Sequence, residues 1–193
     1  MKQKIANKAK EMFLRFGYSK ITLAEISAEM GISKKTIYNH FESKDALLYY
    51  IIDQSRVQFE NEIHEIEASS NQAFREMVMQ ILSLLGIWVS DLRTFTQDLA
   101  KNHPEAKKYL NDIRKDVIIK HAMRIMEKGK KQGLLDNDAR SALALFIFLA
   151  TAEKVSDTDY HKDLPAELTA GFPANPADLF QNIIEIIYQG IKK

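Results

Sequence analysis

Apolar side chains recur at three- and four-residue spacing along almost the whole chain, and this period is the feature that most limits its fold. Ile5, Ala9, Phe13 and Phe16 follow it first. The period gathers apolar side chains on one face of a helix, and another element must cover that face. Seven glycines and four prolines in 193 residues leave few of the turns that a sheet needs. The sequence therefore predicts an all-α fold of about nine helices.

Polar and glycine residues mark where the predicted helices begin and end. Thr22 and Glu25 have the spacing of a capping box, in which the two side chains satisfy each other's backbone N–H groups. Gly31 permits a left-handed turn, and Ser33 suits the cap of the helix that follows. Residues 156–175 are expected to form a loop. The expected helices span 2–16, 23–30, 34–41, 43–66, 74–89, 94–102, 104–129, 139–155 and 176–191.

The start of the chain, its longest apolar stretch and its lack of cysteine bear on location. Residues 1–10 are polar and hold no apolar segment of the kind found in a secretory signal. The longest apolar stretch, 142–152, has about half of the roughly 20 residues that a membrane-spanning helix needs. A chain without cysteine forms no disulfide and no thiolate metal site, which fits a reducing compartment. We expect a cytoplasmic protein without a membrane partner, a cofactor or a bound metal.

The two short helices expected over 23–30 and 34–41 have the dimensions of a helix-turn-helix, joined by Gly31-Ile32-Ser33. Small Ser27 would let the two helices approach closely. Cationic side chains suit phosphate or guanine, an amide suits adenine, and hydroxyls suit either. This pattern is typical of a helix that reads the major groove of DNA. The outward side of the second helix presents Lys34, Lys35, Thr36, Tyr38, Asn39 and His40.

The segment 22–47 closely resembles the DNA-binding region of the tetracycline-repressor (TetR) family of bacterial transcription regulators. The resemblance is carried by Gly-Ile-Ser at 31–33, Tyr-Asn-His-Phe at 38–41 and Ser-Lys-Asp-Ala-Leu at 43–47. It is strong over about residues 5–52, and Ser27 and Met30 depart slightly from the usual residues. The resemblance implies an N-terminal three-helix DNA-binding domain over 1–46, with its helix-turn-helix at 22–41, and an effector-binding and dimerisation domain over 47–193.

The resemblance also implies which side chains meet DNA. Three would bind phosphates and three would approach base edges: Tyr38, His40 and Lys44 in the first group, and Lys35, Thr36 and Asn39 in the second. Thr22 would add a phosphate contact through its hydroxyl or the helix N-terminus. The plainer alternatives are a solvated surface group or, for Thr22, a capping role alone. The complete candidate set is Thr22, Ser33, Lys34, Lys35, Thr36, Tyr38, Asn39, His40 and Lys44.

Charge is unevenly distributed, although 27 basic and 26 acidic residues leave a net charge of only +1. Residues 1–50 hold nine Lys or Arg and five Asp or Glu, a net charge of +4. The other residues hold 18 basic and 21 acidic side chains, a net charge of −3. A basic N-terminal region on an acidic remainder suits a protein that contacts phosphate at one end only.

The apolar helices expected over 140–155 and 177–191 are candidates for a dimer interface. One helix-turn-helix makes few contacts, whereas a homodimer reads two half-sites of a palindromic double-stranded DNA operator. Packed against their two-fold mates, these helices would form a four-helix bundle. The alternative is that both belong to the core of one protomer. The predicted interface residues are Leu143, Phe146, Ile147, Phe180, Ile183, Ile184 and Ile187.

The helices between residues 43 and 129 are expected to enclose a pocket for a small-molecule effector, as the resemblance implies. His121 lies on an apolar face and would supply a polar contact, although a hydrogen bond to a backbone carbonyl is its plainer alternative. Core packing is the plainer alternative for the others, because aromatic and Met side chains at helical spacing usually form core. The candidate lining residues are Met77, Ile81, Trp88, Phe95, Tyr109, Ile113, Val117 and His121.

Together these features predict a repressor that binds its operator as a dimer and is released by a small, mainly apolar effector. An enzyme is an alternative from another class, but the five histidines are scattered and neither a nucleophile motif nor a phosphate loop is present. A helical adaptor that has lost DNA binding is a third alternative. The presence of Lys35 and Tyr38 argues against it. The run 157–161 alternates metal-ligating side chains, but a solvated acidic loop is the expectation there.

Overall fold

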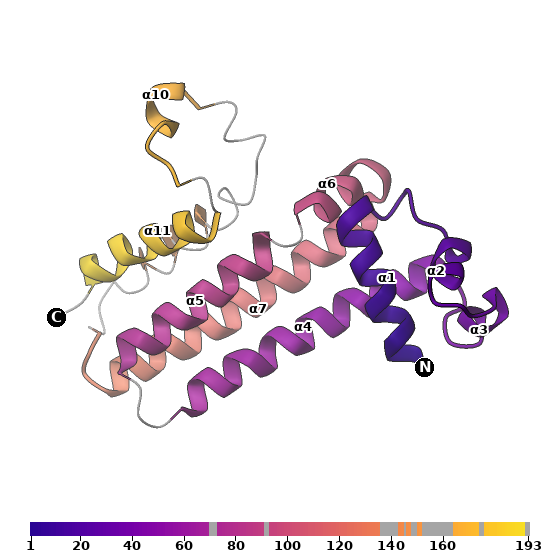
Figure 1. Cartoon of the computed structure of the whole chain (residues 1–193). Coiled ribbons are helices and arrows are strands. Elements are labelled where there is room, and N and C mark those ends of the chain that lie inside the picture. The colour runs from indigo at the N-terminus through magenta and orange to yellow at the C-terminus, as the bar shows by residue number, and fades with distance from the viewer. Residues whose placement is uncertain are drawn as a thin grey trace. The chain divides into compact units, whose positions relative to one another are not determined.

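The computed structural model describes residues 1–69, 73–90, 93–135, 143–144, 146–147, 150–151, 164–173 and 176–191. These residues form helices and the turns between them, with no strand in the described ranges. The predicted all-α fold is confirmed. The helices, coloured along the chain in Figure 1, are α1 (Lys2–Phe16), α2 (Leu23–Glu29), α3 (Lys34–Tyr38), α4 (Lys44–Ala68), α5 (Phe74–Ser90), α6 (Arg93–Asn102), α7 (Pro104–Lys131), α10 (Ala166–Thr169) and α11 (Pro176–Ile191).

Local signals set the ends of the first helices. Gly17 stops α1 in the left-handed region, with φ at 90°, and its N–H donates to the Phe13 carbonyl at 2.9 Å. The capping box of α2 is confirmed, because the Thr22 hydroxyl accepts from the Glu25 N–H at 3.2 Å and the Glu25 carboxylate accepts from the Thr22 N–H at 2.7 Å. Ser33 caps α3 by accepting from a backbone N–H in its first turn.

The structure differs from several of the expected element bounds. Helix α3 ends at Tyr38 and not at residue 41. The His40 and Phe41 N–H groups both donate to the Ile37 carbonyl, which closes a tight turn there. Helix α7 continues past Gly129 to Lys131. The expected loop over 156–175 contains the short helix α10, which begins directly after its N-cap residue, Pro165. Most of the helix expected over 139–155 lies outside the described residues, and the pairs 143–144, 146–147 and 150–151 are helical.

The chain forms two compact units, which we call the N-terminal unit (residues 1–60 and 91–114) and the C-terminal unit (residues 61–90 and 115–193). Helices α4 and α7 each contribute residues to both. The core of the N-terminal unit joins α1, α2, α3, α6 and the parts of α4 and α7 that belong to it. Its most deeply buried large side chains are Ile5, Phe13, Ile26, Ile37, Leu47, Leu48, Leu99 and Leu110.

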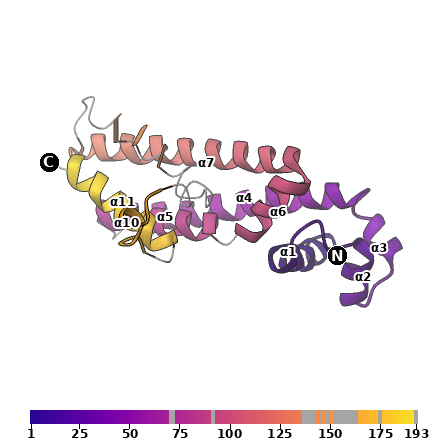
Figure 2. The ribbon, with the colours of Figure 1, turned by 90° about the horizontal axis from the view of Figure 1, so that it is seen from above.

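In the C-terminal unit, α11 packs along α5, as Figures 1 and 2 both show. Arg75 on α5 forms an ion pair of 2.7 Å with Glu185 on α11. Phe180 and Ile184 are buried within the single chain, which favours the alternative that these two residues belong to the core of one protomer. The two residues are one turn apart on α11, so its apolar period places them on one side of the helix, and packing within the protomer covers them.

Gly129 marks a close approach inside the C-terminal unit. A Cβ added there would lie 2.6 Å from Leu135 Cδ1 and 2.7 Å from Phe74 Cζ. We expect Gly129→Ala to lower the free energy of unfolding by about 1–3 kcal/mol, because buried neighbours must shift to admit the methyl group. Urea unfolding measures the change. Gly190→Ala is the matched control, because nothing lies within 4 Å of its added Cβ, and an equal loss in both variants contradicts the packing argument.

Candidate nucleic-acid interface

Helix α3 presents a polar side away from the core of the N-terminal unit. Ile37 is fully buried, whereas the side chain of Tyr38, its neighbour, is 54% exposed. Lys34, Lys35, Asn39 and His40 are also exposed, and Thr36 is half-buried beside the Ser33 hydroxyl. The structure thus leaves the predicted outward residues exposed or half-buried along α3 and the turn that follows it. Their chemistry suits phosphate oxygens and base edges.

The turn between α2 and α3 fixes the position of this side. Gly31 adopts a φ of 63°, a backbone conformation that is strained for residues with a side chain. The Ile32 N–H donates to the Ser27 carbonyl at 3.0 Å, and the Ser27 hydroxyl donates to the Ala24 carbonyl at 2.8 Å. The buried Ser27 hydroxyl therefore has a hydrogen-bond acceptor, and the small Ser27 side chain leaves room for the turn. This geometry agrees with the role predicted for Ser27.

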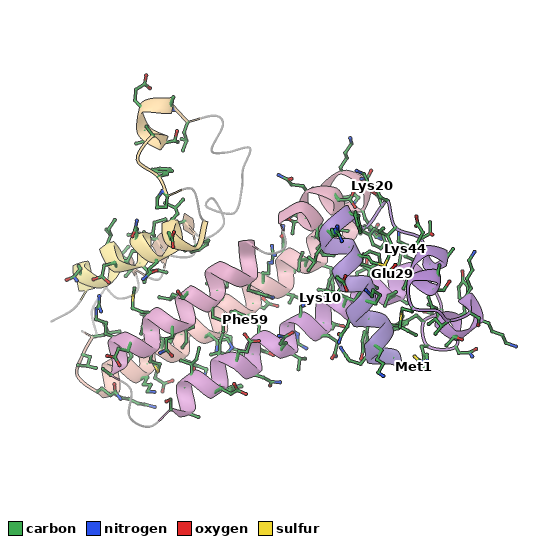
Figure 3. The ribbon with its side chains drawn as sticks, in the orientation of Figure 1. Met1, Lys10, Lys20, Glu29, Lys44 and Phe59 are labelled. Carbon is green, nitrogen blue, oxygen red and sulfur yellow. The ribbon has the colours of Figure 1, made fainter. Side chains whose placement is uncertain are left out.

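Lys44, at the start of α4 and labelled in Figure 3, is partly buried. Its ammonium group donates to the Tyr18 carbonyl at 2.6 Å and lies 3.9 Å from the centre of the Tyr18 ring. Burial lowers the pKa of Lys44 against the opposing effect of nearby carboxylates, Asp45 first among them. A predicted phosphate-binding residue thus also ties α4 to the turn after α1. Its phosphate contact stays a prediction.

Three side chains near this turn were missed by the sequence analysis. The Tyr18 hydroxyl donates to the Asp45 carboxylate, and His103 Nε2 lies 3.4 Å from the same carboxylate. The rings of Tyr18 and His103 are 5.7 Å apart between centroids. These residues come from the turn after α1, from α4 and from the corner between α6 and α7. No local pattern signals such contacts, since their partners are far apart in sequence.

The capping box of α2 gives a pH-dependent prediction. The Thr22 backbone N–H, followed by the Thr22 hydroxyl, holds the pKa of Glu25 below its usual value of 4.5. A carboxyl whose pKa is lowered on folding stabilises the fold above its unfolded pKa and loses this effect as pH falls through its folded pKa. Glu25→Gln should therefore lower the urea midpoint at pH 7, and the difference in midpoint from the parent chain should shrink as the pH falls below 4.5.

Glu42→Gln supplies the baseline for this measurement, because it removes another exposed carboxylate near the helix-turn-helix. If the urea midpoints of Glu25→Gln and the parent chain differ by the same amount at low pH as at pH 7, the charge of the Glu25 carboxylate does not contribute to the cap.

The predicted effector residues fall into the cores of the two units. Phe95 is buried in the core of the N-terminal unit, and Tyr109 and Ile113 pack against that core. The Tyr109 hydroxyl donates to Asp53 at 2.8 Å. A small pocket of the same unit shares Phe95 with the predicted set and is otherwise lined by Lys10, Phe13, Leu14, Ile51, Ile52, Ser55 and Leu110. In the C-terminal unit, Met77, Ile81, Val117 and His121 are buried and Trp88 is half-buried.

His121 belongs to a polar cluster of the C-terminal unit. Its Nδ1 lies 3.9 Å from the Glu67 carboxylate, which also forms an ion pair of 2.9 Å with Arg124. His64 Nδ1 lies 3.5 Å from the same carboxylate, and the two imidazole rings are 6.0 Å apart. His121 was predicted from the sequence, whereas Glu67, whose carboxylate all three partners approach, was not. This cluster places polar side chains in the unit whose buried residues Met77, Ile81 and Val117 are apolar.

Two features are absent from the described part of the chain. Its residues contain no group of three or more His, Cys, Asp or Glu side chains placed to hold a metal ion, and the run 157–161 lies outside them. Among the described helices, none combines the length and apolar character that a membrane crossing requires.

Comparison with known proteins covers the helix-turn-helix and most of the chain. Residues 5–51 match the family model of bacterial regulatory proteins of the tetR family. The uncharacterized HTH-type transcriptional regulator YvaF of Bacillus subtilis is 25% identical over 183 residues, covering 91% of this chain and 87% of that protein. The HTH-type transcriptional regulator TtgR of Pseudomonas putida is 25% identical over 164 residues, covering 75% of this chain and 74% of that protein.

A solved structure extends the likeness to the fold of the whole chain. A transcriptional regulator from Cytophaga hutchinsonii matches with a TM-score of 0.75 at 16% identity, covering 99% of this chain and 98% of the other. The matching proteins are transcriptional regulators, which confirms the interpretation of this chain as a DNA-binding regulator and not an enzyme. With the helix-turn-helix matched by family model and relatives alike, the resemblance of this segment to the tetR family of bacterial regulatory proteins is confirmed.

Proposed function

We propose that this regulator is a repressor that binds a palindromic operator as a homodimer in the cytoplasm and is released by a small, mainly apolar effector. The observation that carries the proposal is the set of exposed polar side chains on α3 and the turn after it, which includes cations, an amide and a phenol, while Ile37 faces the core. In this proposal residues 1–46 form the DNA-binding domain and residues 47–193 bind the effector and the second protomer. The net charge of +4 over residues 1–50 supports the first assignment.

Exposed apolar side chains support a second protomer as a partner. Leu143, Phe146 and Ile147 are 57%, 69% and 51% exposed in the single chain. They lie in the helical pairs 143–144 and 146–147, and exposed apolar side chains gathered in this way mark an interaction site. A two-fold axis would set this surface against its own copy. Ile183 and Ile187 of α11 are only half-buried and complete the interface that we propose, without Phe180 and Ile184.

The effector proposal rests on the buried apolar side chains of the C-terminal unit and on the polar cluster at His121. Met77, Ile81 and Val117 offer an apolar lining, and His121 beside Glu67 offers a hydrogen-bonding group. Apolar walls with few convergent polar groups are usual in small-molecule sites. Release requires that the effector bind the DNA-free form more tightly than the DNA-bound form.

Selection of bound duplexes from a random DNA pool tests the DNA-binding part directly. A recovered palindrome with half-sites spaced by about one turn of DNA supports the proposed dimer. The recovered operator then serves to screen small apolar compounds that release it. Recovery of no preferred sequence contradicts the proposed function.

A further inference from the structure

The carboxylate of Asp98, on α6, reaches the turn between α1 and α2. It accepts the Ser19 backbone N–H at 2.7 Å, together with the Ser19 hydroxyl. Asn102, one helical turn along α6, donates to the same carboxylate at 2.8 Å. Both segments belong to the N-terminal unit, where α1 and α6 pack against each other. Three donors therefore converge on one side chain that lies outside the helix-turn-helix.

The fit at this point is close. A Cβ added to Gly17 would lie 3.2 Å from Asp98 Cγ, and Gly17 already has a φ of 90°. Burial alone would raise the pKa of Asp98, but the hydrogen bonds from Ser19 and Asn102 outweigh burial and leave that pKa below its usual value. The carboxylate is therefore held in its charged form, in which hydrogen bonds are strongest.

The turn that Asp98 holds decides where α2 begins. Ile21 closes the turn by donating to the Tyr18 carbonyl at 3.3 Å, and Thr22 then caps α2. Helix α2 packs against α3, which carries the exposed polar side. A shift of Ser19 would therefore move both helices of the helix-turn-helix. Recognition of base edges requires placement within a fraction of an ångström, whereas attraction to phosphates does not.

We propose that Asp98 is a positioning residue for DNA recognition, fixing the turn at Ser19 and through it the helices α2 and α3. This inference rests on the DNA-binding function proposed above. Asp98 touches no base or phosphate in this proposal. It sets the angle at which the helix-turn-helix leaves α1, so its effect falls on sequence-specific binding and not on general affinity for DNA.

Asp98→Asn tests the proposal, because it keeps the shape of the side chain and removes its charge. Removal of a negative charge should strengthen binding to any DNA if electrostatics alone acts. The positioning role predicts the opposite sign for the selected operator: roughly ten-fold weaker binding, with affinity for a scrambled duplex of equal length unchanged or raised. Asp112→Asn, on an exposed residue of α7 in the same unit, is the control and should weaken neither complex.

A second readout needs no DNA. Hydrogen exchange of the Ser19 amide, followed by NMR, should be slow in the parent chain and faster in Asp98→Asn, because its acceptor is weakened. An unprotected Ser19 amide in the parent chain overturns the inference. So does an unchanged operator affinity in Asp98→Asn, or an equal loss on both duplexes, which would mean a role in folding alone. A parent chain that prefers no duplex overturns the proposed function first, and the positioning role with it.

Discussion

Tyr38→Ala should weaken binding to every DNA duplex, by about 100-fold for a dimer that loses two hydrogen bonds to phosphate, one from each protomer. This change should hardly lower the free energy of unfolding, because the Tyr38 side chain is exposed and the adjacent Ile37 occupies the core. Thermal unfolding should therefore stay close to that of the parent chain. Fluorescence anisotropy with the selected operator and with a scrambled duplex measures the affinities.

Asn39→Ala is the matched variant, because it changes the next exposed residue. A side chain that reads a base edge contributes about 1–3 kcal/mol at one base pair per half-site. Asn39→Ala should therefore weaken the operator complex and relax the sequence preference at that base pair, and leave the scrambled complex unchanged. Operator affinities that are unaltered in both variants would show that α3 does not dock as proposed.

Local signals in the sequence predicted the helix-turn-helix well. The capping box joins residues three positions apart, and the glycine that ends α1 is adjacent to the helix it stops. Such interactions are decided by neighbouring residues, so their spacing is visible in the sequence. The bounds expected for α1 and α11, 2–16 and 176–191, agree with the structure for the same reason.

Contacts between distant segments escaped prediction. Ser19 and Asp98 are separated by 79 positions, and Asp53 and Tyr109 by 56. An aspartate on an amphipathic helix looks the same whether it faces water or a distant backbone N–H. The pairing depends on how α6 packs against α1, which the apolar period does not specify. Lys44 shows the same limit, because its contact with Tyr18 is invisible beside the family motif.

The apolar period also tells which face of a helix is covered without telling what covers it. Phe146 and Phe180 both lie on strongly apolar stretches, and both were predicted from the sequence to lie in one dimer interface. The structure separates them, since Phe180, on the helix that packs along α5, is buried while Phe146 is 69% exposed. This difference makes the two phenylalanines a test of the proposed assembly.

Phe146→Asp should convert the proposed dimer into a monomer of 22.2 kDa without unfolding the chain. A charged side chain placed at the centre of an apolar interface is left without a partner on either protomer, and removing it from water is costly. Sedimentation measures the mass. Because each monomer then meets one half-site alone, operator affinity should fall by roughly 100- to 10,000-fold.

Two variants separate loss of the dimer from loss of the fold. Phe180→Ala opens a cavity in the protomer and should lower the free energy of unfolding by about 3–5 kcal/mol. Leu168→Asp, at another exposed apolar residue of the C-terminal unit, should change neither mass nor stability, because it lies outside the proposed interface. Should Phe146→Asp remain dimeric and bind its operator as the parent chain does, the helical stretch that contains it is not the interface, and the exposed apolar side chains there must serve another contact.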